Sequence, residues 1–210
     1  MKEREKGFSL VELLIVLAII VIISLIAIPQ IQRISASLKI DASGHSVASL
    51  LQQARLQAVH DNAPAYAQIN SATVPNMAYV NNDGTSAYVT GNPDVAISSS
   101  VKFQDPGPAL RQQLDAYLGA TGTPGGPNPQ VGTPIGFNAR GLPCVPGATP
   151  AVCLQKDGTG AIPVFEWLMT DANGNWEAVT VTAAGRIKAW RLSNQGPSSP
   201  ASCGYAACWQ

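Results

Sequence analysis

Charged side chains are scarce in this sequence: Asp, Glu, Lys and Arg make up 12% of 210 residues, against about 25% in an ordinary soluble domain. Thirteen basic residues balance thirteen acidic ones, so the formal net charge is zero. A chain without net charge has no long-range attraction for nucleic acid. Its length suits an apolar anchor and one domain of ordinary size, which excludes a multidomain enzyme.

Residues with catalytic potential are also few. The two histidines, His45 and His60, both fall in a helical amino-terminal segment, and the chain has neither a serine elbow nor a phosphate-binding glycine loop. Glu166, beside Trp167, is interpreted as a strand residue with its carboxylate in solvent. We therefore expect no enzymatic activity, no metal and no cofactor.

Cysteine is limited to four residues, which are Cys144, Cys153, Cys203 and Cys208. A zinc site is disfavoured because there is no CxxC pair and neither histidine is near them in sequence. Four cysteines allow three disulfide pairings. Chain proximity favours Cys144 with Cys153 and Cys203 with Cys208, which would close two short loops in segments rich in Gly and Pro.

The sequence does contain one long apolar run, at residues 8–28, broken only by Ser9, Glu12 and Ser24. As a helix it would be roughly 30 Å long, which is enough to cross the hydrocarbon core of a bilayer. A secretory signal would have a shorter apolar core followed by a cleavage site, so we expect this helix to be retained. Glu12 is anomalous, because an acidic side chain in a membrane helix costs about 3 kcal/mol and is usually kept for a partner.

The string around this acid, Gly7-Phe8-Ser9-Leu10-Val11-Glu12-Leu13-Leu14, resembles the type IV prepilin signature of pilins and type II secretion pseudopilins. The resemblance implies that a prepilin peptidase cuts between Gly7 and Phe8 and that Phe8 is then N-methylated. It also implies that Glu12 pairs with the free amine of a neighbouring subunit during assembly. Pro29 lies where pilins commonly carry a proline. The alternative is a plain anchor whose Glu12 snorkels to the interface.

The resemblance divides the chain into a leader at 1–7, a membrane-spanning or filament-core half-helix at 8–29, and a head at 30–210 that includes the second half of the helix. It implies a single-pass protein of the bacterial inner membrane with its head in the periplasm, which later enters a pilus or pseudopilus. The implied partners are the prepilin peptidase, other pilin or pseudopilin subunits and the inner-membrane assembly platform. The basic leader residues agree with a cytoplasmic amino terminus.

Beyond Pro29, apolar residues recur every three or four positions until a proline at position 64 stops the pattern. We expect one helix over 8–61. Pro29 removes a backbone hydrogen bond and should bend it, and Ser43-Gly44 is a second weak place.

After residue 64, short runs of β-formers alternate with turn residues, which predicts a small antiparallel sheet. A short helix is expected at 108–118, and the Gly- and Pro-rich segment 119–150 is interpreted as a surface excursion. The fold class is therefore α+β and pilin-like, with the second half of the long helix packed on the sheet. The predicted strands cover 65–69, 77–80, 87–90, 95–103, 162–169, 175–182 and 186–192.

Three segments resemble the GspH/FimT-type minor pseudopilins. Residues 51–59 carry Arg55 and Ala58 where that branch commonly has an arginine and an alanine. Residues 135–141 resemble its apolar-Phe strand ending in glycine, and residues 179–187 resemble its final hairpin with Gly-Arg. The resemblance implies a minor structural subunit that helps to prime or cap a type II secretion pseudopilus or a type IV pilus.

A basic strip follows this Gly-Arg pair, with Arg186, Lys188 and Arg191 around Trp190. Some FimT-type pilins bind DNA through a Gly-Arg-x-Arg element here, and this chain has a lysine at the last position. The resemblance thus makes DNA an alternative partner, for a minor pilin that takes up DNA. A solvated strand face is the favoured interpretation, because three cations are a weak footprint.

Asp171, Asn173 and Asn175 alternate as calcium ligands often do. Trp176 stands where a calcium loop needs glycine, and no bidentate glutamate follows. Asn173-Gly174 is instead a strong hairpin signal, so a turn is favoured over a calcium site.

Overall fold

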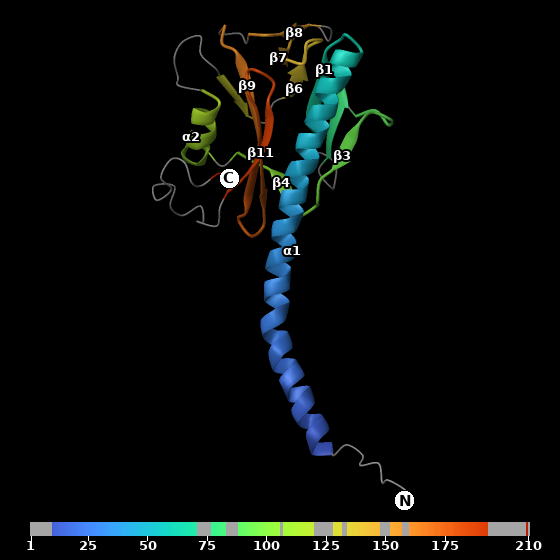
Figure 1. The fold of residues 1–210 in the computed structure, drawn as a ribbon, viewed down its shortest axis with the longest axis vertical. Coiled ribbons are helices and arrows are strands. Elements are labelled where there is room, and N and C mark those ends of the chain that lie inside the picture. Colours follow the sequence, from blue (N-terminus) through green and yellow to red (C-terminus); the bar gives the residue numbers. More distant parts are fainter. Residues whose placement is uncertain are drawn as a thin grey trace, which may run out of the picture.

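The computed structural model describes residues 10–70, 77–82, 88–105, 107–119, 128–131, 134–147, 152–156, 160–192 and 209. Helix α1 (Leu10–His60) is 51 residues long and continues through Pro29 and Gly44. Figure 1 shows a curved rod whose upper half lies along the head and whose lower half extends away from it. The helix is uninterrupted at Ser43-Gly44, and that this pair is a second weak place stays a prediction. That Pro29 causes the curvature stays a prediction.

The head contains two sheets rather than one. The first has six strands in the order β3-β2-β1-β6-β7-β8, and every pair in it is antiparallel. Its strands are β1 (Ala65–Asn70), β2 (Met77–Asn81), β3 (Asp94–Ala96), β6 (Ile135–Phe137), β7 (Pro143–Pro146) and β8 (Cys153–Leu154).

The second sheet has the order β11-β10-β9-β4, and β5 also pairs with β9, in parallel. Its strands are β4 (Val101–Phe103), β5 (Asn128–Val131), β9 (Pro163–Asp171), β10 (Trp176–Val181) and β11 (Ile187–Arg191). The three carboxyl-terminal strands are the predicted ones within two residues at either end. The turn at Asn173-Gly174 joins β9 to β10, as the sequence indicates.

Three predictions for the middle of the chain are wrong. The run 95–103 is not one strand, because a turn closed by Val101 N–H on the Ser98 carbonyl (2.8 Å) sends β3 and β4 into different sheets. Residues 88–90 lie in a loop rather than a strand, and residue 87 lies outside the described residues. The segment 119–150 is not only a surface excursion, since it contributes β5, β6 and β7.

The glycine content of this segment partly reflects close packing rather than exposure. A Cβ on Gly136 would lie 2.6 Å from the Tyr66 ring, so only glycine allows β6 to approach β1 this closely. The neighbouring side chains Ile135 and Phe137 are fully buried.

The main core lies between α1 and the sheets. Small residues on this face of the helix, Ala54 and Ala58, let the strands approach closely, and Trp167 and Phe165 fill the space from β9. Burying each large apolar side chain contributes about 1.5–3 kcal/mol. The other buried apolar residues of α1 are Ile40, Val47, Leu50 and Leu51.

A second apolar cluster lies on the other face of the second sheet, beneath α2 (Pro108–Tyr117). Leu114 of α2 is buried there with Leu168 of β9, and Trp209 bridges to Leu192. Pro at the first position and a positive φ at Gly119 delimit this helix, as predicted. The second sheet is therefore covered by a helix on each face, and all six residues of β10 are buried.

Candidate assembly surface and sites of the head

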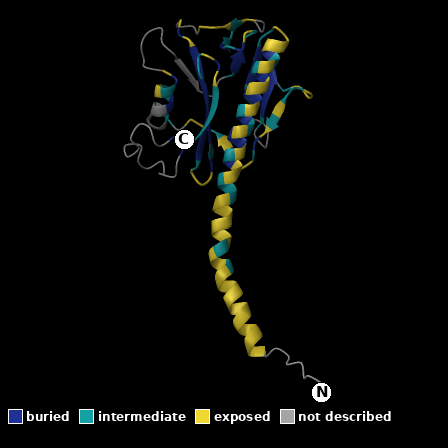
Figure 2. Cartoon of the chain, viewed as in Figure 1, coloured by how far each residue is buried: buried dark blue, intermediate teal, exposed yellow. Residues whose placement is uncertain are grey.

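The first half of α1 is an uncovered apolar surface. Every large apolar side chain from Leu10 to Ile28 is 45–74% exposed. Figure 2 shows this part of the rod as almost uniformly exposed. Its most apolar 18-residue window has a mean hydropathy of 3.3 and is not buried by the head, and the helix is long enough to cross a membrane. Such a surface is stable in lipid or among other apolar helices.

Glu12 lies in the first turn of the described helix and is exposed. The predicted cleavage and N-methylation sites, Gly7 and Phe8, lie outside the described residues. The roles assigned to these three residues stay predictions.

Below the head, the apolar surface narrows to a stripe. Ile31, Ile34 and Leu38 are 64%, 60% and 60% exposed and line a shallow groove of about 410 Å³ with Ser35, Lys39 and Ala42. The first buried residue of α1 is Ile40. Ile31 and Ile40 are nine residues apart, about two and a half turns, so the stripe faces away from the head.

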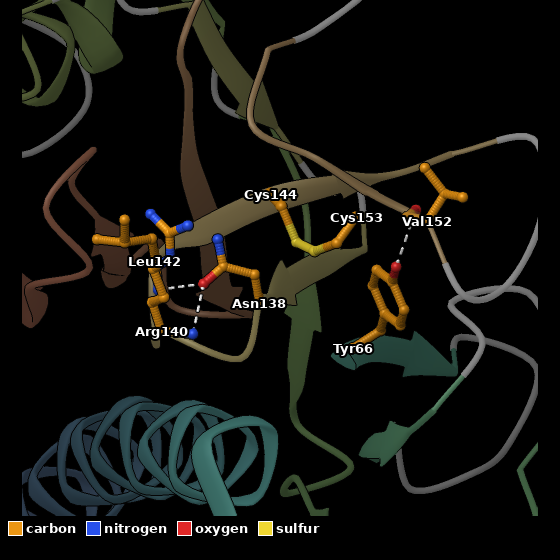
Figure 3. The surroundings of a disulfide bond; sticks show 7 residues. All are labelled: Tyr66, Asn138, Arg140, Leu142, Cys144, Val152 and Cys153. Carbon is orange, nitrogen blue, oxygen red and sulfur yellow. Dashed lines mark hydrogen bonds between the residues drawn. A yellow bond between two sulfur atoms is a disulfide. The ribbon is translucent and has the colours of Figure 1, made fainter. Parts of the chain in front are cut away.

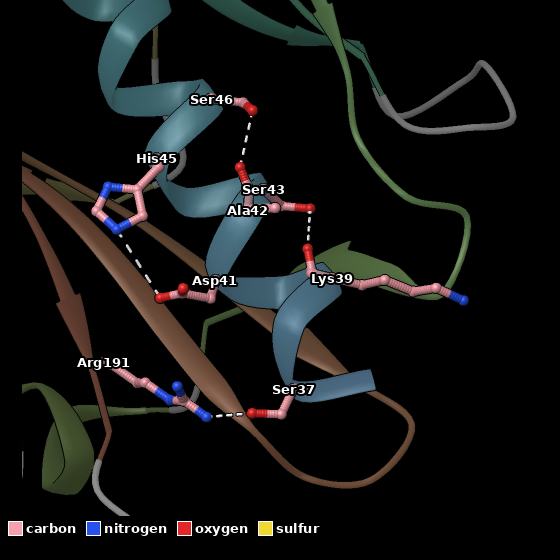
Figure 4. A network of polar contacts seen from close by, with 8 residues as sticks. All are labelled: Ser37, Lys39, Asp41, Ala42, Ser43, His45, Ser46 and Arg191. Atoms are coloured by element: carbon pink, nitrogen blue, oxygen red, sulfur yellow. Dashed lines mark hydrogen bonds and ion pairs between the residues drawn. The ribbon is translucent and has the colours of Figure 1, made fainter. Parts of the chain in front are cut away.

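The lower contact between head and helix is made around Glu177 of β10, which is 1% exposed. It lies against Gly44 of α1, where a Cβ would be 2.7 Å from the Glu177 Cγ. Burial, and secondarily the charge of Asp41, raise the pKa of Glu177 to about 8, and Arg191 opposes the shift. Arg191 also donates a hydrogen bond to the Ser37 hydroxyl of α1, as Figure 4 shows.

The structure divides the predicted basic strip. Arg191 points to α1, whereas Lys188 stacks on Trp190 with its Nζ 3.4 Å from the ring centroid. Trp190 is held in turn by its Nε1 donating to Thr180 Oγ1 at 2.8 Å. Arg186 is the one cation of the three with an exposed side chain. The three therefore form no continuous basic face, and DNA binding stays a prediction.

The three segments that resemble GspH/FimT-type proteins meet at Arg55. Its Nη1 donates to the Gly185 carbonyl at 3.0 Å. A Cβ on Gly141 would lie 3.0 Å from Arg55 Nε, and one on Gly185 would lie 2.7 Å from the Gly141 carbonyl. Both glycines have positive φ. Arg55 thus fastens the helix to two turns that touch each other, and Ala58 is buried one turn further on.

Cys144 and Cys153 form a disulfide, with Cα atoms 5.4 Å apart, that ties β7 to β8. Figure 3 shows the Tyr66 hydroxyl donating to the Val152 carbonyl (3.2 Å) beside this bond. The end of the six-stranded sheet is therefore fastened both covalently and to a buried tyrosine of β1. The second expected pair, Cys203 and Cys208, lies outside the described residues.

The carboxylate of Asp171 stabilises the turn that follows β9. Asp171 Oδ1 accepts hydrogen bonds from the backbone N–H groups of Asn173 and Asn175, each at 2.9 Å, and its Oδ2 accepts one from Asn175 Nδ2 at 2.7 Å. This is the geometry of the hairpin turn that the sequence favoured. Within the described part of the chain, no group of three or more His, Cys, Asp or Glu residues is placed to hold a metal ion.

The expectation that Glu166 is solvated is wrong. Its side chain has 0% exposure and lies beneath α2, because that helix covers the second face of β9. Burial, and secondarily the neighbouring Asp115, raise the pKa of Glu166 to about 8, and Arg111 acts in the opposite direction. Arg111 is itself paired with Asp105, Nε to Oδ1 at 3.2 Å. The burial of both glutamates was not predicted from the sequence. A polar residue in a strand is normally assigned to the solvent face, and the sequence does not show that both faces of this sheet are covered.

Comparison with known proteins gives one family match, to the prokaryotic N-terminal methylation motif at residues 2–28. No curated protein sequence matches the chain. The crystal structure of the type IV minor pilin FimU of Pseudomonas aeruginosa is 12% identical, with 72% of this chain and 88% of that chain covered and a TM-score of 0.39. The minor pseudopilin EpsH from the Type 2 Secretion System of Vibrio cholerae is 9% identical, with 72% and 95% covered and a TM-score of 0.38.

Likeness at that level assigns no function. The amino-terminal motif and the observed architecture do not depend on these two structures. Residues 2–28 match the methylation motif, and helix α1, which begins within that motif, carries a head made mainly of antiparallel strands. The chain is therefore an α+β protein with a long amino-terminal helix, and it carries a prokaryotic N-terminal methylation motif at residues 2–28.

Proposed function

We propose that this protein is a minor pilin or pseudopilin, a structural subunit that is processed at Gly7-Phe8, methylated on Phe8 and assembled through α1 into a filament. Before assembly it is anchored in the bacterial inner membrane with its head in the periplasm. Its partners are the prepilin peptidase, sister subunits and the assembly platform. The same assembly chemistry serves a type II secretion pseudopilus and a type IV pilus, and the proposal covers both.

The observation that carries the proposal is the exposed apolar half of α1. Its side chains from Leu10 to Ile28 contact no part of the described head, so this surface is available entirely to lipid or to neighbouring helices. In a bilayer, apolar helices gain little hydrophobic energy from one another, and packing and polar contacts decide association. The half-helix can therefore exchange lipid for sister helices while the head keeps its fold.

Glu12 supplies the polar contact in this scheme. Its carboxylate is costly in an apolar environment unless a positive group compensates it. The amine released on Phe8 by leader cleavage is such a group, and in the filament it belongs to a neighbouring subunit. Processing and assembly are thereby linked, since an uncleaved neighbour has no amine at this position.

The test is mass spectrometry of the native protein from cells with the prepilin peptidase and assembly machinery, together with its recovery in sheared filaments. We expect a methylated Phe8 at the amino terminus and the protein in the filament fraction. Protein that retains its first seven residues in such cells would overturn the proposal.

The alternative function, DNA capture through the last strand, has less support, because Lys188 stacks on Trp190 and Arg191 faces α1. A salt-sensitive shift of duplex DNA by the purified full chain, lost on Arg186→Ala, would support it. No shift at low salt would exclude it.

A further inference from the structure

The charges on α1 define how deeply it sits in a membrane. Between Glu12 and Arg33, the twenty residues 13–32 carry no charged side chain. As helix they extend about 30 Å, the thickness of the hydrocarbon core. A shift of the helix in either direction would bring one of the two charges into that core, which is unfavourable. The membrane stage of the proposed function therefore has a preferred depth, with Glu12 at one face and Arg33 at the other.

At that depth, the segment just below the head lies in the headgroup layer. Arg33 to Lys39 covers about 10 Å of helix above the edge of the hydrocarbon core, which is enough to cross a headgroup layer of about 5–8 Å. In this segment Ile34 and Leu38 are exposed on one side and line a groove together with Lys39, which lies above both of them on the helix. The combination of apolar side chains below and a cation above matches the order of chemical groups in a phospholipid.

Both cations are free to bind. Within the described residues no carboxylate lies within ion-pair distance of Arg33 or Lys39. In Figure 4 the Lys39 side chain extends away from Asp41, whose carboxylate is directed to His45 at 3.9 Å. Arg33 is exposed on the helix below that network.

The acid of the β9–β10 turn does not face the membrane surface. The contact of Arg191 with Ser37 places the lower end of β11, and with it the β9–β10 turn, beside the emerging helix. The acid of that turn, Asp171, is 7% exposed, and both of its oxygens accept hydrogen bonds from the turn. Its charge is therefore turned inwards.

We propose that Arg33 and Lys39 bind the phosphate groups of anionic phospholipids in the periplasmic leaflet of the inner membrane, with Ile34 against the upper ends of the acyl chains and Leu38 within the headgroup layer. This collar, residues 33–39, holds the head directly on the membrane surface before assembly. The inference rests on the proposed function for its membrane stage and adds the lipid class that the anchored subunit selects.

The test is native mass spectrometry of the processed chain, residues 8–210, in micelles that contain equal amounts of phosphatidylglycerol and phosphatidylcholine. We expect bound phosphatidylglycerol to exceed phosphatidylcholine by roughly fivefold for each cation engaged. The double variant Arg33→Gln/Lys39→Gln should bind the two lipids equally. Arg33→Lys, which keeps the charge, should retain the preference, as should the control Lys156→Gln, which removes an exposed cation next to β8 at the far end of the head.

Equal binding of both lipids by the wild type, or a preference that survives in the double variant, would overturn the inference. Displacement of the lipid by inorganic phosphate at equal concentration would also overturn it, since the site would then recognise free phosphate. These readouts are separate from the test of function: a subunit that enters filaments but shows no lipid preference keeps the proposed function and loses the collar.

Discussion

The side chain of Glu177 on β10 fills the position that a side chain at residue 44 of α1 would occupy. Because residue 44 is glycine, the helix surface has a gap there, and the buried carboxyl side chain fits into it. A glycine in the middle of a 51-residue helix costs about 1 kcal/mol relative to alanine. Here it allows the second sheet to pack directly on the helix backbone. A position that the sequence marks as a second weak place in the helix is therefore a contact point with the head.

Gly44→Ala should lower the stability of the head by about 1–3 kcal/mol, despite the better helix propensity of alanine, because the new methyl group overlaps a side chain that cannot move into solvent. Urea unfolding measures the change. Ser49→Ala, an exposed position one turn further on, is the control and should be neutral or slightly stabilising. Gly44→Ala/Glu177→Ala should recover part of the loss, and strict additivity of the two single changes would contradict the overlap.

The two buried glutamates predict a head that loses stability as pH rises. Glu166 and Glu177 have pKa values of about 8 in the folded protein, against the usual glutamate pKa of 4.5, which applies in the unfolded chain. The folded protein therefore holds more protons than the unfolded chain between these values, and stability is highest near and below pH 4.5. Across the window it should fall by about 1 kcal/mol per pH unit for each group.

Thermal unfolding of the wild type between pH 4.5 and 8 measures this dependence. Glu166→Gln and Glu177→Gln should each flatten it, because a neutral amide needs no proton, and each should raise stability at pH 8. A wild-type head that is more stable at pH 8 than at pH 5 would refute the sign of both shifts.

Glu12→Ala should leave cleavage at Gly7-Phe8 intact and strongly reduce incorporation into filaments. Cleavage needs the junction itself, whereas incorporation uses the carboxylate that compensates the amine of Phe8. Immunoblots of membrane and sheared fractions measure the two steps. Ser24→Ala is the matched control, because the Ser24 hydroxyl already donates to the Ile20 carbonyl at 2.7 Å within the helix; normal incorporation of Glu12→Ala would argue against pairing.

Gly185→Ala should destabilise the head more than Gly174→Ala. Both glycines close hairpin turns with nearly equal φ, 77° and 76°, so both substitutions introduce about 1 kcal/mol of left-handed strain. Only at Gly185 would the methyl group meet a backbone atom, the Gly141 carbonyl at 2.7 Å, whereas nothing lies within 4 Å at Gly174. Chemical denaturation of the two variants measures the difference, and equal losses would show that the two turns are not packed as described.

Cys144→Ser/Cys153→Ser should lower stability by about 2–3 kcal/mol, as expected for a cross-link that closes a loop with a sequence separation of 9. The comparison is unfolding of the double variant against the oxidised wild type. Reduction of the wild type should have a similar effect. An unchanged midpoint in both cases would mean that the hairpin is ordered without the bond.

Much of the architecture was accessible from local patterns. Signals between residues close in the chain, such as apolar periodicity and the positions of proline and glycine, predicted four features. These are the long helix, α2, the Asn173-Gly174 turn and the three last strands. The expectation of a single sheet failed, because the turn at residues 98–100 splits one β-rich run between two sheets. The strand at 135–137 was expected only from the family resemblance and not from local pattern, because it lies within a Gly-rich segment whose Gly136 contacts Tyr66, some seventy residues away in the chain.

The site residues divide in the same way. The sequence alone determined the apolar run, the uncharged stretch 13–32 between Glu12 and Arg33 and the methylation motif, because these depend on the order of residues along one helix. Only the tertiary structure decided that Arg191 and Lys188 diverge and that Glu166 and Glu177 are buried. The physical reason is that helices α1 and α2 cover opposite faces of the second sheet, and which face of a strand meets water depends on packing between segments far apart in the chain.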